Sequence, residues 1–123
     1  MRKSSKRREF LDYVTDIFDA TERIEEFVKG FNSKKFKEDE KTIFAVVRAF
    51  EIIGEATKNI PAKVKNKYKE VPWRQMAGMR NKLIHEYFGA NTEVVWKTIK
   101  KDIPDLKEKI SKILKESKKH KLL

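Results

Sequence analysis

Side chains near the start of the chain recur at alternating spacings of four and three, which is typical of one apolar face of an α-helix. No segment shows a convincing alternation with a period of two. The pattern therefore predicts a chain built from helices, with a first long helix that ends at Gly30 and the turn-forming NSKK segment after it. The residues of the stripe are Phe10, Val14, Ile17, Thr21, Ile24, Val28 and Phe31.

A second periodic run is apolar around much of the helix circumference. It covers residues 42–60, TIFAVVRAFEIIGEATKNI, with Asp39 placed to cap its start and Pro61 placed to end it. A helix of this kind is contacted on several sides, so we expect it to be the central helix of the fold. A weaker short helix is expected directly after it, at residues 62–68.

The remaining segments are punctuated by proline, glycine and asparagine. Residues 72–89 begin with a proline suited to a first helical turn and end with a glycine, so they are expected to form a third long helix. Asn91 or Thr92 can cap a fourth helix that runs through Lys101. Pro104 then starts or kinks a fifth segment.

These elements predict an all-α fold, an antiparallel four- to five-helix bundle. With 123 residues the chain can bury one modest core but not two, so residues 1–123 are expected to form a single domain. The lysine-rich end, from about residue 115 to 123, is expected to fray or to extend beyond the bundle. A solvated helix end is the preferred interpretation of it, ahead of a dedicated nucleic-acid tail.

The charge balance of the chain is strongly basic. Lys and Arg number 30 against 19 Asp and Glu, a formal net charge of +11. Such an excess attracts polyanions, and charge alone does not choose among RNA, DNA, an anionic membrane and an acidic protein. The chain has no cysteine and only two histidines, His85 and His120, too few for a zinc cluster without carboxylate help. No metal and no cofactor is therefore expected.

The first residues, MRKSSKRR, resemble the basic start of a signal peptide. The apolar stretch that should follow is interrupted by Asp12, Asp16 and Asp19, and no apolar run approaches the length that crosses a membrane. The sequence predicts a soluble, cytoplasmic protein with no membrane partner.

The stretch MRNKLIHEY brings an arginine, a histidine and a tyrosine together on the expected third long helix. At about 100° per residue, Arg80 and Tyr87 share a face, whereas His85 lies some 140° around the helix from Arg80. The arginine and histidine can meet if the arginine stem bends, if the last turn is irregular, or if two copies of the helix pack around a twofold axis. The twofold arrangement is preferred.

These residue types suit the cleavage of a phosphodiester. The imidazole of His85 can take or give a proton near neutral pH, and the guanidinium of Arg80 matches phosphate oxygens and the charge that grows in the transition state. Asn81 could orient the guanidinium or the phosphate. RNA is the expected substrate because its 2′-hydroxyl can attack the neighbouring phosphorus. From spacing alone, a surface arginine and a histidine at a packing edge are the more common interpretation.

Other polar and aromatic residues are assigned supporting parts. Arg48, Glu51 and Glu55 share a face of the central helix, where they are expected to pair with one another and to support the cleft. The large aromatic residues are interpreted as core or interface anchors rather than as platforms for stacked bases. These are Tyr13, Tyr68, Trp73 and Trp96.

Three blocks, RAFEIIGEATKNIP, VPWRQMAGMRNKLIHEYFG and VVWKTIKKDIPDL, together resemble the HepT-like toxins of the HEPN superfamily. The likeness runs from about Arg8 to Leu114, and the order of the blocks is more specific than any one of them. The family motif of an arginine, four residues, a histidine, any residue and a tyrosine is met in full by Arg80, His85 and Tyr87.

The resemblance implies a homodimeric, metal-independent endoribonuclease that leaves 2′,3′-cyclic phosphate ends and acts as the toxin of a type VII toxin–antitoxin module. Arg80 and His85 would be catalytic, with Asn81, Glu55 and Arg48 in support. The partner it implies is a cognate MNT-type nucleotidyltransferase, the antitoxin, which transfers AMP to the motif tyrosine, here Tyr87. An attached nucleotide would place bulk and negative charge where the substrate phosphate should lie.

Two other functions remain open at the level of the sequence. The chain could be a non-catalytic helical subunit that binds substrate for a nucleotidyltransferase or docks to it, in which case it would cut nothing alone. It could also be a basic RNA-binding adapter, which predicts steeply salt-dependent binding without cleavage.

Overall fold

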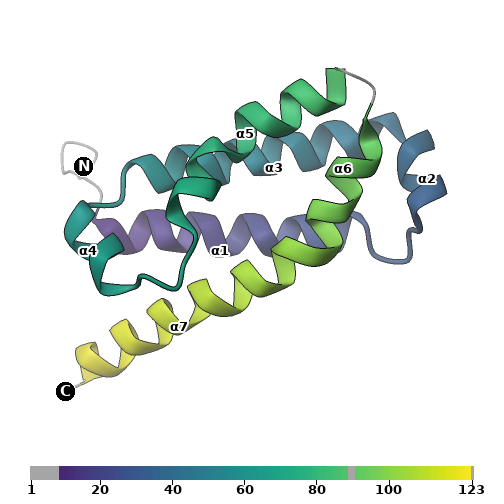
Figure 1. The fold of residues 1–123 in the computed structure, drawn as a ribbon. Helices are drawn as coiled ribbons and strands as arrows, with labels where there is room; N and C mark the ends of the chain where they lie inside the picture. The colour runs from purple at the N-terminus through teal and green to yellow at the C-terminus, as the bar shows by residue number, and fades with distance from the viewer. Residues whose placement is uncertain (1–8, 89–90, 123) are drawn as a thin grey trace, which may run out of the picture.

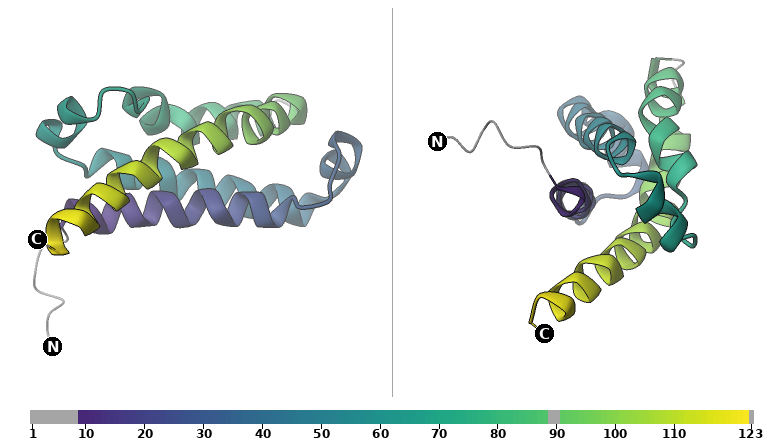
Figure 2. Two further views of the ribbon diagram at one scale, coloured as in Figure 1. Left: turned by 90° about the horizontal axis from the view of Figure 1, so that it is seen from below. Right: turned by 90° about the vertical axis from the view of Figure 1, so that its left-hand side faces the viewer.

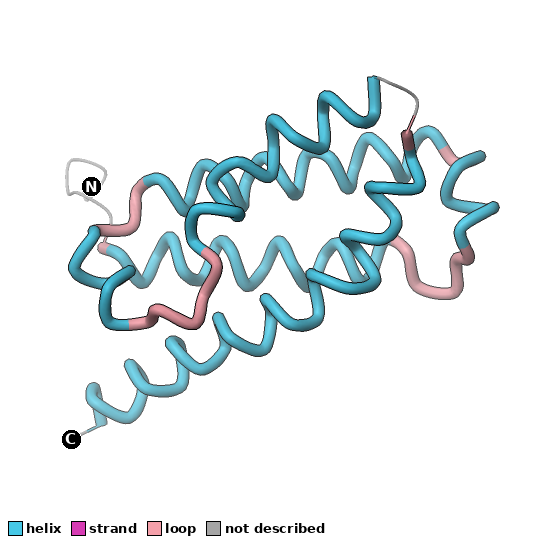
Figure 3. Tube along the Cα trace, viewed as in Figure 1, coloured by secondary structure: helices cyan, strands magenta, loops and turns pink. Residues whose placement is uncertain are grey.

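The computed structural model describes the backbone of residues 9–88 and 91–122 and the side chains of residues 9–81 and 91–117. Every regular element in these ranges is helical (Figure 3), which confirms the all-α prediction. The elements are α1 (Phe10–Phe27), α2 (Ser33–Glu38), α3 (Glu40–Lys58), α4 (Ala62–Lys67), α5 (Trp73–Phe88), α6 (Thr92–Lys97), the π-helical segment η2 (Thr98–Asp102) and α7 (Ile103–Leu122). None of the helices in the described ranges is both long and apolar enough to cross a lipid bilayer.

The body of the molecule consists of α1, α3, α5 and a rod formed by α6, η2 and α7, each antiparallel to the one before it (Figure 1). α1 packs against α3 and α7, and α3 packs against both α1 and α5. The central position predicted for residues 42–60 is thus confirmed. The short helices α2 and α4 lie at opposite ends of the bundle (Figures 1 and 2).

The stripe predicted on the first helix faces the core. α1 ends at Phe27, and Gly30 follows with a φ of +80°, a conformation that glycine adopts without steric cost. The predicted stop is therefore confirmed. The fully buried members of the stripe are Val14, Ile17, Thr21 and Ile24.

Residues 33–35 of the NSKK segment belong to α2 and Asn32 precedes the helix, so the interpretation of the segment as turn residues is wrong. The Asn32 side chain accepts a hydrogen bond of 2.8 Å from the Lys35 N–H and caps α2. Phe36 is fully buried, and its ring centroid lies 5.2 Å from that of Trp96. A single buried aromatic anchor thus outweighs the turn propensity of the polar residues around it.

A polar contact fastens α2 to α6 beside this anchor. The Glu93 carboxylate lies 3.1 Å from Lys37 Nζ and accepts a hydrogen bond of 3.0 Å from Ser33 Oγ. These two partners, Lys37 first, lower the pKa of Glu93 below its usual range.

Two helix caps expected from the sequence are present. Asp39 accepts a hydrogen bond of 3.0 Å from the Thr42 N–H at the start of α3. Of the two candidates before α6, Asn91 is the cap, with the Val94 N–H 3.3 Å from its Oδ1. Side-chain oxygens at these positions satisfy N–H groups that have no partner within the helix.

Residues 92–122 are helical without a break, but α6 and η2 end at Asp102, α7 begins at Ile103, and the helix axis bends between α6 and α7 (Figure 1). The expected fourth helix, and a fifth segment that Pro104 starts or kinks, are thus confirmed. Pro104 has no N–H to donate to the carbonyl of Lys100 four residues earlier. The chain widens here into a π-turn, in which the Ile103 N–H donates to the Thr98 carbonyl. The proline is therefore accommodated inside the rod.

The lysine-rich end continues α7 as a helix to Leu122. Ile110 and Ile113 are fully buried, and Glu116 accepts a hydrogen bond of 2.8 Å from the hydroxyl of Tyr68. The helix is thus tied to the bundle as far as Glu116. Side chains beyond Ser117, and with them most of the predicted extension, lie outside the described residues.

Candidate active site

The close approach of α3 to α5 is set by Gly54. A Cβ at this position would lie 3.5 Å from the carbonyl oxygen of Ala77 and 3.6 Å from the Cβ of Arg80. These are ordinary van der Waals distances, so an alanine just fits and a larger side chain would separate the helices. Gly54 thereby places the first residue of the arginine–histidine–tyrosine motif directly over α3.

The guanidinium of Arg80 is held from two sides. Its Nε donates to Glu51 Oε2 at 3.0 Å, and its Nη1 donates to Asn81 Oδ1 at 3.0 Å. Arg48 approaches the other oxygen of the same carboxylate, with its Nη1 3.4 Å from Glu51 Oε1. Glu51 therefore links the central helix to the motif on α5 and leaves other N–H groups of Arg80 for a ligand.

These residues border a groove of about 180 Å³ between α3 and α5. Three cationic side chains and two carboxylates line it, so it offers positive charge to an anion without being uniformly basic. Arg80 is about half exposed, with 47% of its side-chain surface accessible. The lining residues are Arg48, Glu51, Gly54, Glu55, Lys58, Ala77, Arg80 and Asn81.

The structure thus brings together Arg80, Asn81, Arg48 and Glu55, which the sequence proposed for one site. The backbones of His85 and Tyr87 belong to α5, whereas their side chains lie outside the described residues. α5 remains α-helical through Phe88, so an irregular last turn does not bring the histidine toward the arginine. Two ways of bringing Arg80 and His85 together remain: a bend of the arginine stem, or a second copy of the helix across a twofold axis.

Sequence reasoning missed Lys58 and Gly54. Residues 48, 51, 55 and 58 follow one another at spacings of three and four, so the periodicity that grouped the first three could have added Lys58. Gly54 carries no signal of its own in the sequence, because its importance depends on the approach of α5.

The anchoring role expected of the aromatic residues is confirmed for three of the four. Tyr68, Trp73 and Trp96 are buried, and Tyr13 is partly buried against the same core. The indole N–H of Trp73 donates to the backbone carbonyl of Tyr68 at 2.9 Å, and because both rings are buried, neither is free to stack on a base. Among the described residues, no group of three or more His, Asp and Glu side chains could hold a metal ion.

Comparison with known proteins assigns the family. The description "Ribonuclease HepT-like" matches residues 17–113, which include both helices of the groove and the whole motif. The chain belongs to the HepT-like family. The resemblance drawn from the three sequence blocks, and the HEPN superfamily with it, is thereby confirmed.

Relatives of this HepT-like protein match it along nearly their whole length. A protein of Thermococcus cleftensis named "Probable ribonuclease HepT" is 54% identical over 109 residues, which cover 89% of this chain and 99% of that one. A "Putative RNase" of Caldanaerobacter subterraneus subsp. tengcongensis is 45% identical, and the match covers 86% of this chain and 95% of that one. A "Putative RNase" of Methanocaldococcus jannaschii is 39% identical, and the match covers 89% of this chain and 91% of that one. No solved structure gives a significant match to this chain.

Proposed function

We propose that this HepT-like protein is an endoribonuclease that cleaves RNA at the groove between α3 and α5 without a metal ion. The observation that carries the proposal is the orientation of Arg80, whose guanidinium is held by Glu51 and Asn81 beside the groove. Its family and the ribonuclease names of its relatives support the same activity.

The reaction needs a proton acceptor, a proton donor and charge stabilisation. The 2′-hydroxyl attacks the neighbouring phosphorus, its proton passes to a base, and the bond to the 5′-oxygen breaks as that oxygen takes up a proton. His85 supplies the imidazole for proton transfer, and Arg80 stabilises the charge on the phosphoryl oxygens. Asn81, Glu55 and Arg48 support this arrangement. The products are a 2′,3′-cyclic phosphate and a free 5′-hydroxyl.

A homodimer completes the site in this proposal. Arg80 and His85 lie some 140° apart around α5, so a second motif across a twofold axis would supply groups that one helix cannot aim at the same phosphate. Phe44 supports such an assembly, because it is the large apolar side chain that is most open in the described part of the chain, with 55% exposed. It lies on the same face of α3 as Arg48, beside the groove.

The assembly has its own test. Phe44→Asp should turn a dimer into a monomer in light scattering, because burying a carboxylate at an apolar contact is costly. The control is Lys41→Asp, at an exposed position on the same helix as Phe44. Phe27→Asp would not serve, because the Phe27 ring packs on the core. A chain that is monomeric before any substitution would contradict the twofold site.

We further propose that Tyr87 is the point of regulation in a toxin–antitoxin module. An MNT-type nucleotidyltransferase would join AMP to it: the phenol oxygen attacks the α-phosphorus of ATP, pyrophosphate leaves, and the phenolic proton is released. Because Tyr87 shares a helical face with Arg80, the added phosphate would pair with the guanidinium and block the substrate. Intact mass after co-expression with the nucleotidyltransferase, followed by peptide mapping, tests this step.

Cleavage itself is tested with labelled RNA in excess chelator. Wild-type protein should give fragments with cyclic phosphate ends, whereas Arg80→Ala and His85→Ala should abolish them while the helical content and melting temperature persist. The matched controls are Arg23→Ala, an exposed arginine on α1, and His120→Ala, the other histidine of the chain. Both controls should cut as the wild type does.

The same experiment separates the proposed nuclease from the two other functions. Purified protein that cuts no RNA under any condition would favour a docking subunit or an RNA-binding adapter. Retained cleavage by both Arg80→Ala and His85→Ala would reject the roles given to these residues.

A further inference from the structure

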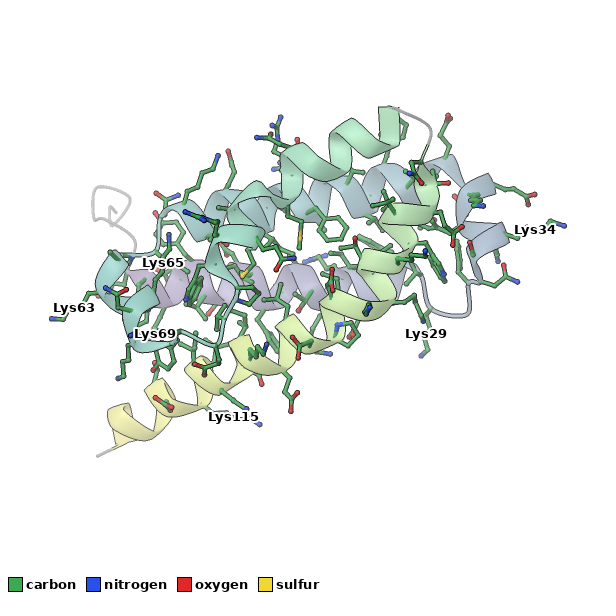
Figure 4. The ribbon with its side chains drawn as sticks, viewed as in Figure 1. Lys29, Lys34, Lys63, Lys65, Lys69 and Lys115 are labelled. Atoms are coloured by element: carbon green, nitrogen blue, oxygen red, sulfur yellow. The ribbon has the colours of Figure 1, made fainter. Side chains whose placement is uncertain are left out.

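A stretch of strong positive charge extends from the groove to the end of the molecule occupied by α4. Between residues 58 and 81 there are seven Lys and Arg residues and a single acid, Glu70. Lys63, Lys65 and Lys69 project from this end, whereas Lys29 and Lys34 lie at the opposite end beside α2 (Figure 4). The seven cationic residues are Lys58, Lys63, Lys65, Lys67, Lys69, Arg74 and Arg80.

Most of these cations have no carboxylate to neutralise them. Elsewhere in the described chain, Lys37, Lys107 and Lys109 form ion pairs with acidic side chains. Within the stretch only Arg80 has an acidic partner, Glu51, among the side chains that the structure describes. What sets the stretch apart is the single acid, Glu70, that accompanies its seven cations. The cations of α4 and of the segment after it therefore present a positive potential to solvent.

The charges surround a hollow of about 570 Å³ where the chain passes from α4 to α5. Its inner side is apolar, with Val71 and Trp73 buried, and its rim carries the charged groups. Since Trp73 is only 8% exposed, the hollow offers no free ring for a base. Lysine heads recognise phosphates as point charges, so the hollow suits a polyanionic backbone of any sequence. The rim cations are Lys65, Lys69 and Arg74.

This surface and the groove share the same helix. Arg74 at the first turn of α5 borders the hollow, and Arg80 six residues later borders the groove. At 1.5 Å per residue these positions are about 9 Å apart along the helix axis, which exceeds the roughly 3.4 Å rise of one nucleotide in a stacked strand. Lys58, at the end of α3, lies on the groove and leads directly into α4.

From this placement we infer a second RNA-binding surface, formed by Lys65, Lys69 and Arg74, which holds the backbone of a single strand a few nucleotides from the phosphate that is cut. The inference rests on the proposed ribonuclease function. It adds that substrate affinity depends on strand length and on salt, and that this surface contributes to binding rather than to the chemical step.

The surface is tested by neutralising its rim. Lys65→Gln/Lys69→Gln/Arg74→Gln removes three charges, and Lys29→Gln/Lys34→Gln/Lys41→Gln removes three from exposed positions away from the groove as the matched control. Binding of a fluorescent single-stranded RNA of about twelve nucleotides is measured by anisotropy at several salt concentrations, with His85→Ala added to each protein to prevent cleavage. Cleavage of the same RNA is measured with His85 intact.

The rim variant should bind at least about tenfold more weakly near physiological salt. The slope of log K against log salt should fall by about two, because each phosphate contact on a single strand contributes roughly 0.7. KM should rise by a similar factor at unchanged kcat, and the control should match the wild type. Equal weakening of both variants would mean general charge attraction and would overturn the inference, as would no weakening in either.

Two further outcomes separate this inference from its alternatives. If polyglutamate of equal charge competes as well as RNA, the surface belongs to an acidic protein partner and the inference is wrong. If the wild type cuts no RNA but the rim variant alone loses affinity and salt slope, the proposed nuclease fails while the binding surface stands. If the wild type cuts RNA and the rim variant has an unchanged KM, the surface fails while the nuclease stands.

Discussion

Glu51 on α3 holds Arg80 on α5, with Arg80 Nε 3.0 Å from Glu51 Oε2. Both side chains retain contact with solvent, 47% for the arginine and 24% for the glutamate. An ion pair of this exposure contributes about 0–1 kcal/mol to folding, which is little for a domain of this size. The contact therefore matters more for the direction of the guanidinium than for the stability of the bundle.

Glu51→Ala is expected to slow RNA cleavage by about tenfold or more, because the guanidinium loses the partner that aims it at the groove. The melting temperature should change little. Glu51→Gln keeps an oxygen that can accept from Arg80 Nε and should restore much of the rate. Single-turnover cleavage and thermal unfolding provide the two readouts.

Glu26→Ala, an exposed carboxylate on α1, is the matched control for this substitution. It should leave the rate unchanged. Wild-type cleavage by Glu51→Ala would show that Arg80 is aimed by other contacts.

Gly54 is expected to tolerate alanine but not leucine. Gly54→Ala meets its neighbours at 3.5 Å or more, so the gain in helix propensity should stabilise the fold by about 0.5–1 kcal/mol with cleavage retained. Gly54→Leu should lower both stability and cleavage, because it drives α5 and Arg80 away from α3. Chemical denaturation and the cleavage assay measure the two effects.

Gly78 on α5 gives the comparison for this pair, since a Cβ there would meet nothing within 4 Å. Gly78→Ala and Gly78→Leu should both be tolerated. If Gly54→Leu behaved in the same way, the close approach of the two helices would not matter for the site.

The sequence predicted those parts of the fold that follow from local periodicity and capping. The α1 stripe, the central α3 and the caps at Asp39 and Asn91 are local features, so a short stretch of sequence is enough to predict each of them. One prediction failed where a distant contact decided the outcome: α2 forms because Phe36 is buried against Trp96, sixty residues away. The change at Pro104 was predicted, whereas the π-turn that accommodates the proline was not.

The candidate site was predictable to the same extent. Helical spacing placed Arg48, Glu51 and Glu55 on one face, and the structure sets that face against Arg80. Which atom of Glu51 meets which nitrogen of Arg80 depends on the crossing of α3 and α5 at Gly54, and periodicity does not encode that crossing.

Phe36→Ala is expected to destabilise the protein by about 3–5 kcal/mol, because it removes a fully buried ring and leaves a cavity beside Trp96. A change of that size is a large part of the stability of a small domain. Phe36→Leu should cost much less, since it refills most of the volume. Amide hydrogen exchange should show faster exchange across α2 in the alanine variant, and uniform exchange would argue against its anchoring role.

Tyr68→Phe is expected to cost about 1 kcal/mol at neutral pH, because Glu116 loses the hydroxyl that donates to it at 2.8 Å. The ring itself remains, so the loss reports the hydrogen bond that ties α7 to the α4–α5 connection. Glu116→Gln keeps an acceptor for the hydroxyl and should be less damaging. The three proteins are compared by urea unfolding.

The same contact predicts how stability depends on alkaline pH. Burial first, then the hydrogen bond to Glu116 and the charges of Glu116 and Glu70, raise the pKa of Tyr68 from 10.0 to about 12. The folded state thus favours the protonated phenol, so this contribution is complete below pH 10 and is lost as the pH rises through about 12. The stability difference between wild type and Tyr68→Phe should narrow over that interval. A difference that stays constant, or a tyrosinate absorbance titration unchanged by the substitution, would contradict the shifted pKa.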